Sequence, residues 1–264
     1  GSGRVVLELN DGRTYFLDTT RVVETGIEGS LAKAERKSLV YEKRETEELI
    51  YNKVTVPRAG EYALTLSDGT RVWLNSDTEI RYPVAFSGKQ RIVFLTGEAY
   101  FEVTKDSTRP FRVVVNDMEV KVYGTSFNVN THYQGKILTT LVEGKVGIRV
   151  KSTGAESILR PNQMAEFNRE KEEVEVTDVD PYYYTAWRAG EFVFQNETIE
   201  EIMDRLCRWY DTEVFYANDD VRGKRFTGVI ARFTDVADVL HLIGETATVQ
   251  FNLKGDVITV SDSR

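Results

Sequence analysis

Residues 64–103 constrain the fold more than any other stretch, because their apolar and polar side chains alternate along most of its length. Two alternating runs, LTL and RVWLN, flank the sequence Ser67-Asp68-Gly69-Thr70. Alternation with period two is typical of half-buried strands. Asp-Gly between two such runs predicts a tight hairpin with Gly69 at positive φ.

A second strand–turn–strand unit follows in the same stretch. Arg91–Leu95 is predicted as a strand, Thr96-Gly97 as a break, and Glu98–Val103 as the next strand. Ala99, Phe101 and Val103 are expected on one face of that strand.

Two internal similarities predict that such units are repeated. Leu7–Asp18 aligns with Leu64–Asn75, including the Asp-Gly pair and three leucines. Gly97–Val103 aligns more weakly with Gly144–Val150, and there the ordinary likeness of any two hairpins is an equal alternative. Repeated strand–turn–strand units favour stacked β layers.

The remaining residues up to about 180 show no clear helical pattern. Residues 32–44 carry a charge pattern compatible with a helix, although a strand at Leu39–Tyr41 is favoured. Arg81-Tyr82-Pro83 is predicted as a turn, Gly124 as a residue with positive φ, and Asn128 as a side chain that bonds the backbone; a ligand loop is the less favoured alternative. Further strands are predicted at Leu49–Val56, Phe111–Val115, Val120–Val122, Phe127–Asn130, Ile137–Val142, Val146–Val150 and Val174–Val176.

The pattern changes after Asp178, where an aromatic connector holds Tyr182, Tyr183, Tyr184 and Trp187. Thr198-Ile199-Glu200-Glu201 has the form of a capping box and predicts a helix start. A second helical stripe at 236–243 is expected to stop at Gly244. We therefore expect a mainly β protein, with an all-β domain at residues 1–180 (core 56–167) and a small α/β domain at 188–264 in the order βαββαββ.

Composition excludes several classes of function. The net charge is −8 and no basic run occurs, so nucleic acid is not expected as a partner. Cys207 is a single cysteine, expected to be buried and inert, and neither His132 nor His241 has a partner at metal-ligand spacing. Glu98 and Glu102 could form an acid–base pair, but an exposed sheet face is favoured. No catalytic residue, metal or cofactor is predicted.

Residues 56–167 include the runs SDGTRVWLN, LTGEAYFEV, YGTSFNVN and LRPNQMAEF. These runs resemble the FecR family, the periplasmic parts of membrane-bound anti-sigma factors. The residues that carry the resemblance are structural, namely Asp68, Gly69, Trp73, Gly97, Gly124, Phe127 and Asn128. WRAGEFVF and EIMDRLCRWYDTEVFY resemble the short signalling domain of secretins and TonB-dependent receptors, in its Bacteroidota form.

The resemblance implies a function that composition does not show. The periplasmic signalling domain of an outer-membrane TonB-dependent transducer would contact this region, and a cytoplasmic sigma factor would be released after proteolysis. No run of about 18 apolar residues occurs. Because Gly1-Ser2-Gly3 is typical of an engineered leader, we expect a soluble fragment whose cytoplasmic domain and N-terminal membrane helix are absent.

The docking surface is expected on the strand Glu191–Gln195. Phe192 and Phe194 should face the core, while Val193 and Gln195 face outward and accept a partner strand. The alternative surface is the aromatic connector, Tyr182 to Trp187. A carbohydrate-binding module or a glycan-active envelope protein is the alternative function.

Overall fold

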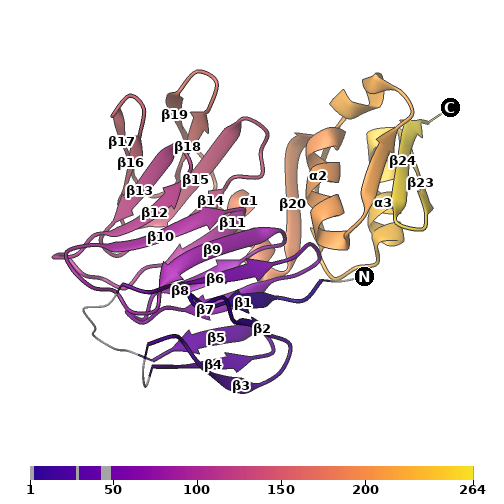
Figure 1. The fold of residues 1–264 in the computed structure, drawn as a ribbon. Helices are drawn as coiled ribbons and strands as arrows, with labels where there is room; N and C mark the ends of the chain where they lie inside the picture. The colour runs from indigo at the N-terminus through magenta and orange to yellow at the C-terminus, as the bar shows by residue number, and fades with distance from the viewer. Residues whose placement is uncertain (1–2, 28–29, 43–48, 264) are drawn as a thin grey trace. The chain divides into compact units, whose positions relative to one another are not determined.

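The structure is a computed structural model that describes residues 3–27, 30–42 and 49–263. It divides into two compact units, which meet in the sequence at Pro181 and Tyr182 (Figure 1). Strands make up 49% of the chain and helices 15%, which confirms the predicted mainly β class.

Among the described residues, the N-terminal unit contains one sheet of nine strands. Its strands, in spatial order, are β17 (Glu156–Leu159), β16 (Val146–Val150), β13 (Met118–Val122), β12 (Phe111–Val115), β10 (Arg91–Thr96), β9 (Thr78–Pro83), β6 (Tyr51–Val56), β1 (Val6–Glu8) and β2 (Thr14–Phe16).

The same unit contains a second sheet, with ten strands in the described part of the chain. In spatial order they are β19 (Glu173–Asp178), β18 (Gln163–Asn168), β15 (Lys136–Glu143), β14 (Ser126–Asn130), β11 (Glu98–Glu102), β8 (Arg71–Leu74), β7 (Tyr62–Thr65), β5 (Ser38–Tyr41), β4 (Leu31–Glu35) and β3 (Arg21–Glu24).

From β6 onward the chain alternates between the two sheets, usually after two strands, so that strand pairs stack in layers. One apolar core runs through the unit. Phe101 of β11 and Phe111 of β12 belong to different sheets, and their ring centroids lie 6.2 Å apart. The alternating side chains of both sheets therefore fill one common interior.

The two aligned hairpins have the same turn. Gly12 N donates to Leu9 O and Gly69 N donates to Leu66 O, each at 2.9 Å. The leucines of both hairpins are buried. The first internal similarity is thus structural, although β1–β2 lies in one sheet and β7–β8 in the other.

The structure corrects several sequence expectations for this unit and decides between two alternatives at residues 32–44. Thr96-Gly97 does not join a hairpin, because β10 and β11 pair in different sheets. Residues 81–83 end strand β9 rather than form a turn, and the hydroxyl of buried Tyr82 lies 3.0 Å from that of Tyr41. The helical alternative at residues 32–44 fails within its described part, where β4 and β5 are strands; residues 43 and 44 lie outside the described residues.

The C-terminal unit follows the predicted order of strands and helices. Its elements are α1 (Tyr182–Thr185), η1 (Ala186–Ala189), β20 (Glu191–Thr198), α2 (Ile199–Tyr210), β21 (Glu213–Tyr216), η2 (Asp219–Gly223), β22 (Arg225–Ala231), α3 (Val236–Ala247), β23 (Val249–Lys254) and β24 (Val257–Asp262). In the part of the chain that is described, β20 pairs with β22, and β21, β24 and β23 form a second sheet.

For the two long helices, the sequence predicts the start of α2 correctly and the end of α3 wrongly. Thr198 caps α2 in a complete capping box with Glu201, as predicted. Gly244 does not end α3, which continues to Ala247. A side chain at Gly244 would place its Cβ 3.1 Å from Val249 O, so the glycine allows close approach of β23 instead.

Candidate functional site

The predicted docking strand lies in β20, but its side chains do not alternate as expected. Phe192 and Phe194 are buried in the core of the unit and Gln195 is exposed, as predicted. Val193 is only 2% exposed, so the outward orientation expected for it is wrong. Within this unit α1, η1 and α2 all pack against β20, and a strand covered in this way does not keep a simple two-sided pattern.

The aromatic connector forms α1 and η1 rather than an extended linker. Tyr182 is exposed, and its hydroxyl donates to the carboxylate of Glu191. Trp187 is buried, and its carbonyl oxygen accepts a hydrogen bond of 2.8 Å from Arg232. Tyr183 and Tyr184 are half-buried. The run is therefore not a continuous exposed aromatic surface.

An exposed strand edge exists elsewhere in this unit, on β23. Among the described residues β23 pairs with β24 alone, so its other edge lacks a partner strand. A groove of about 670 Å³ runs beside this edge, between β23 and α3. Gln250 and Asn252 on β23 are exposed, while Phe251 packs against the core. This edge offers the geometry that strand addition requires.

The motif residues of the N-terminal unit have structural roles. The carboxylate of Asp68 accepts from Thr70 N at 2.9 Å and from Arg91 Nη1 at 2.8 Å. Arg91 Nη1 also donates to Thr104 O and Nε donates to Arg109 O, so this buried pair ties the β7–β8 turn to β10. No local pattern in the sequence indicated Arg91 as the partner of Asp68.

The glycines and rings of the motif lie at turns and in the core. Gly69 and Gly124 have positive φ, as predicted, and so does Gly97. Phe127 stacks on Phe101 at 5.1 Å between ring centroids, and Trp73 packs edge-on against Tyr100 at 5.9 Å.

Glu98 is buried, which contradicts the exposed sheet face expected for it. Its carboxylate accepts from Asn75 Nδ2 at 2.7 Å and from Asn128 Nδ2 at 3.0 Å. Asn128 therefore bonds the side chain of Glu98. Glu102 instead forms an ion pair with Arg71. The two carboxylates therefore contact different side chains.

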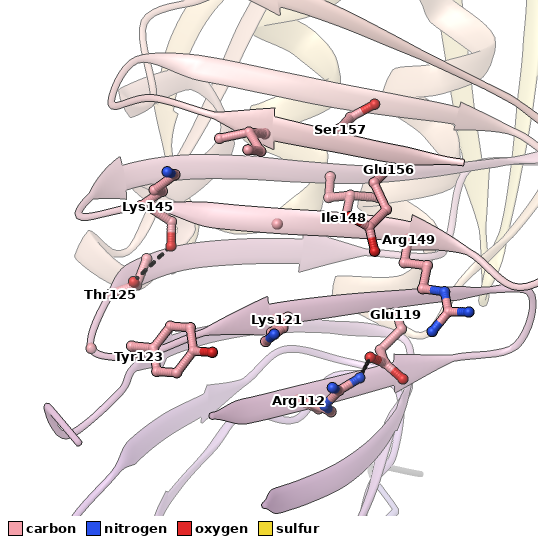
Figure 2. Close-up of a pocket in the computed structure, with 13 residues that line it drawn as sticks. Arg112, Glu119, Lys121, Tyr123, Thr125, Lys145, Ile148, Arg149, Glu156 and Ser157 are labelled. Carbon is pink, nitrogen blue, oxygen red and sulfur yellow. Dashed lines mark hydrogen bonds and ion pairs between the residues drawn. The ribbon is translucent and has the colours of Figure 1, made fainter. Parts of the chain in front are cut away.

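A depression lies on the outer face of the nine-stranded sheet, over β12, β13, β16 and β17. We call it the Gly147 hollow, and its volume is about 490 Å³. Figure 2 shows Arg112 and Glu119 pointing toward one another at one end of the hollow, where they form an ion pair. Lys121, Lys145 and Arg149 also line it. A glycine inside a predicted strand was the available sequence signal for this site.

The remaining candidate side chains from the sequence are the two histidines and the cysteine. Within residues 3–27, 30–42 and 49–263, no group of three or more His, Cys, Asp or Glu side chains is arranged to hold a metal ion. His132 Nε2 lies 3.2 Å from Ser76 O, and His241 lies 3.4 Å from Glu245 on the surface of α3. Cys207 is buried, as predicted.

Comparison with known proteins assigns the family. Residues 52–147 match the model of the FecR protein, and residues 191–260 match that of the FecR C-terminal region. The two matches together cover more than half of the chain. The chain belongs to the FecR family. This FecR family member is also similar to two solved structures, both of a candidate anti-sigma factor from Parabacteroides distasonis ATCC 8503.

The first of these structures, at 1.65 Å resolution, is 28% identical, with a TM-score of 0.74 over 80% of this FecR chain and 99% of that chain. The second, at 2.50 Å, has the same identity and TM-score over 81% and 100%. No curated protein gives a match. Among the described helices of this FecR family member, none combines the length and hydropathy needed to cross a membrane.

Proposed function

We propose that this chain is the periplasmic signal-sensing region of an inner-membrane anti-sigma factor. It relays the state of an outer-membrane TonB-dependent transducer to a cytoplasmic sigma factor, and it does so by binding rather than by catalysis. Membership of the FecR family and the likeness to a candidate anti-sigma factor support the regulatory role.

The observation that carries the proposal is the unpaired edge of β23 in the C-terminal unit. An edge strand presents backbone amide and carbonyl groups that a partner strand can bind, and the neighbouring groove accepts that strand's side chains. We place the transducer's signalling domain on this edge. We prefer β23 to β20 as the docking strand, because Val193 of β20 is buried. A substitution of Val193 would also disturb the core of the unit, so it could not test docking.

Binding of the isolated signalling domain of a neighbouring-gene transducer tests the proposal. Asn252→Lys places a charge on the β23 edge, where lysine hinders strand addition. We expect it to weaken binding about tenfold, which corresponds to 1.4 kcal/mol, measured by calorimetry. Amides of β23 should also gain protection from hydrogen exchange when the signalling domain is added.

Thr177→Lys is the matched control. It adds the same charge at an exposed position of β19, which is an edge strand of the N-terminal unit. Binding by this variant should equal that of the unmodified chain. If the control weakens binding as much as Asn252→Lys, or if protection falls on the N-terminal unit, docking at β23 is wrong. If no transducer domain binds the intact chain, the proposed relay itself fails.

A further inference from the structure

The Gly147 hollow arises from a missing side chain in an otherwise complete row. On the outer face, Arg112 pairs across the sheet with Lys121, Lys121 with Gly147, and Gly147 with Ile158. Gly147 therefore interrupts a row of side chains that crosses four neighbouring strands, with Lys121 on one side of it and Ile158 on the other. The depression is consequently open to solvent at its middle and walled at its ends.

Nothing in the backbone requires a glycine at this position. Its φ is not positive, and an added Cβ would lie 3.7 Å from its nearest neighbour, Lys121 O, which is an ordinary contact. Glycine in the interior of a strand weakens the strand, and it often marks close approach of a ligand. The hollow therefore has a stability cost that a larger side chain would remove.

The charges around the hollow are unbalanced. Among the described residues, the side chains of Lys121, Lys145 and Arg149 take part in no hydrogen bond or ion pair, while Glu119 is neutralised by Arg112. Glu156 is the one unpaired carboxylate among the lining residues. Three cations against one anion leave an excess of positive charge, on a chain whose net charge is −8.

Two exposed apolar side chains complete the site. Tyr123 is 46% exposed, with the Lys121 ammonium 5.5 Å from its ring centroid, and Ile158 is 59% exposed. Figure 2 shows Tyr123 and Lys121 beside one another, and Arg149 near Glu119. An occupant needs an apolar face for Tyr123 or Ile158, and a negative group for the cations.

We propose that the Gly147 hollow binds a small carboxylated saccharide of the uronic-acid class. A pyranose ring offers an apolar face to an aromatic side chain, and its carboxylate forms charge-assisted hydrogen bonds with arginine or lysine. The unpaired Glu156 accepts hydrogen bonds from the sugar hydroxyls. The volume of about 490 Å³ lies in the range of small-ligand pockets.

Calorimetric titration of the intact chain with D-glucuronate and digalacturonate tests the site. Both uronates should bind at millimolar or lower concentration, with affinity that falls as salt rises. Galactose, acetate and inorganic phosphate should bind at least about tenfold more weakly, a difference of 1.4 kcal/mol. Equal affinity for acetate or phosphate would reduce the hollow to a general anion site, and equal affinity for galactose would remove the role of charge.

Variants locate the binding. Gly147→Val fills the hollow, and it should abolish uronate binding while the melting temperature stays the same or rises. Lys121→Gln and Arg149→Gln should each weaken uronate binding. They test the site if the Gly147→Val variant does not fold. Lys171→Gln, at an exposed lysine outside the hollow, is the control and should bind normally. The proposal is wrong if the intact chain binds no uronate. It is also wrong if Gly147→Val and both glutamine variants bind uronate as well as the intact chain does. Either result is independent of the outcome for the β23 edge.

Discussion

The carboxylate of Asp68 and the guanidinium of Arg91 form a buried ion pair, with side chains 8% and 1% exposed. Two carbonyl oxygens accept the remaining hydrogen bonds of the guanidinium, although its Nη2 has no partner. A buried charge needs its counter-ion more than an exposed one does, because water cannot replace the lost partner. Asp68 therefore does more than form the hairpin turn that the sequence predicts. It also neutralises the buried charge of Arg91.

Loss of this carboxylate should destabilise the N-terminal unit strongly. We expect Asp68→Ala to lower the free energy of unfolding by about 3–5 kcal/mol, since Arg91 stays buried and charged. Glu35→Ala removes the partner of Lys33 in a pair whose side chains are 48% and 61% exposed, and it should lower the free energy of unfolding far less. Urea unfolding measures the free energy of unfolding of both variants. An equal decrease in the two would show that burial of the ion pair is unimportant.

At the scale of elements, two turns require glycine for different reasons. Gly69 joins β7 to β8 with φ of +85°, and an added Cβ would lie 3.4 Å from Thr104 Oγ1. Gly124 lies between β13 and β14 with φ of +144°, and an added Cβ would lie 2.8 Å from Lys105 Cα. Backbone strain acts at both turns, whereas a backbone clash acts only at Gly124.

The two turns should therefore differ in their tolerance of alanine. Gly69→Ala should cost about 1–3 kcal/mol from left-handed backbone strain, and Gly124→Ala should cost more. Gly147→Ala is the control without strain or clash, and it should leave stability unchanged or slightly higher. Chemical denaturation measures all three, and a larger loss for Gly69→Ala than for Gly124→Ala would contradict this ranking.

At the scale of the whole molecule, each unit has its own apolar core. The residues of one core cluster lie between Leu7 and Phe167, and those of the other lie between Phe192 and Val260. A segment with a separate core can fold alone. The division into domains at residues 1–180 and 188–264 stays a prediction, which fragments can test.

Fragments 3–181 and 182–264 should both fold in isolation. We expect each to give a cooperative thermal transition, with a β-type circular dichroism spectrum for the first fragment and a mixed α/β spectrum for the second. A fragment that melts without cooperativity, or that needs the other fragment to fold, would show that the two units are one folding domain.

The sequence by itself determined the features that depend on neighbours a few residues away. Period-two alternation located most strands, Asp68-Gly69 located a hairpin turn, and the Thr198 capping box located a helix start. These signals are reliable because φ preference, side-chain periodicity and capping hydrogen bonds act within one turn or one strand. The strands β3 and β4 escaped prediction, because β3 has only four residues and the alternating alanines of β4 are weakly apolar.

Only the tertiary structure decided which distant residues meet. In it β10 and β11 lie in different sheets, and Asp68 pairs with Arg91. Val193 and Glu98 are buried, and α3 continues beyond Gly244. The tertiary structure also turned a glycine in strand β16 into the centre of a charged hollow, since the walls of that hollow come from three other strands. Burial and pairing across sheets depend on side chains far apart in the sequence, so no local pattern can specify them.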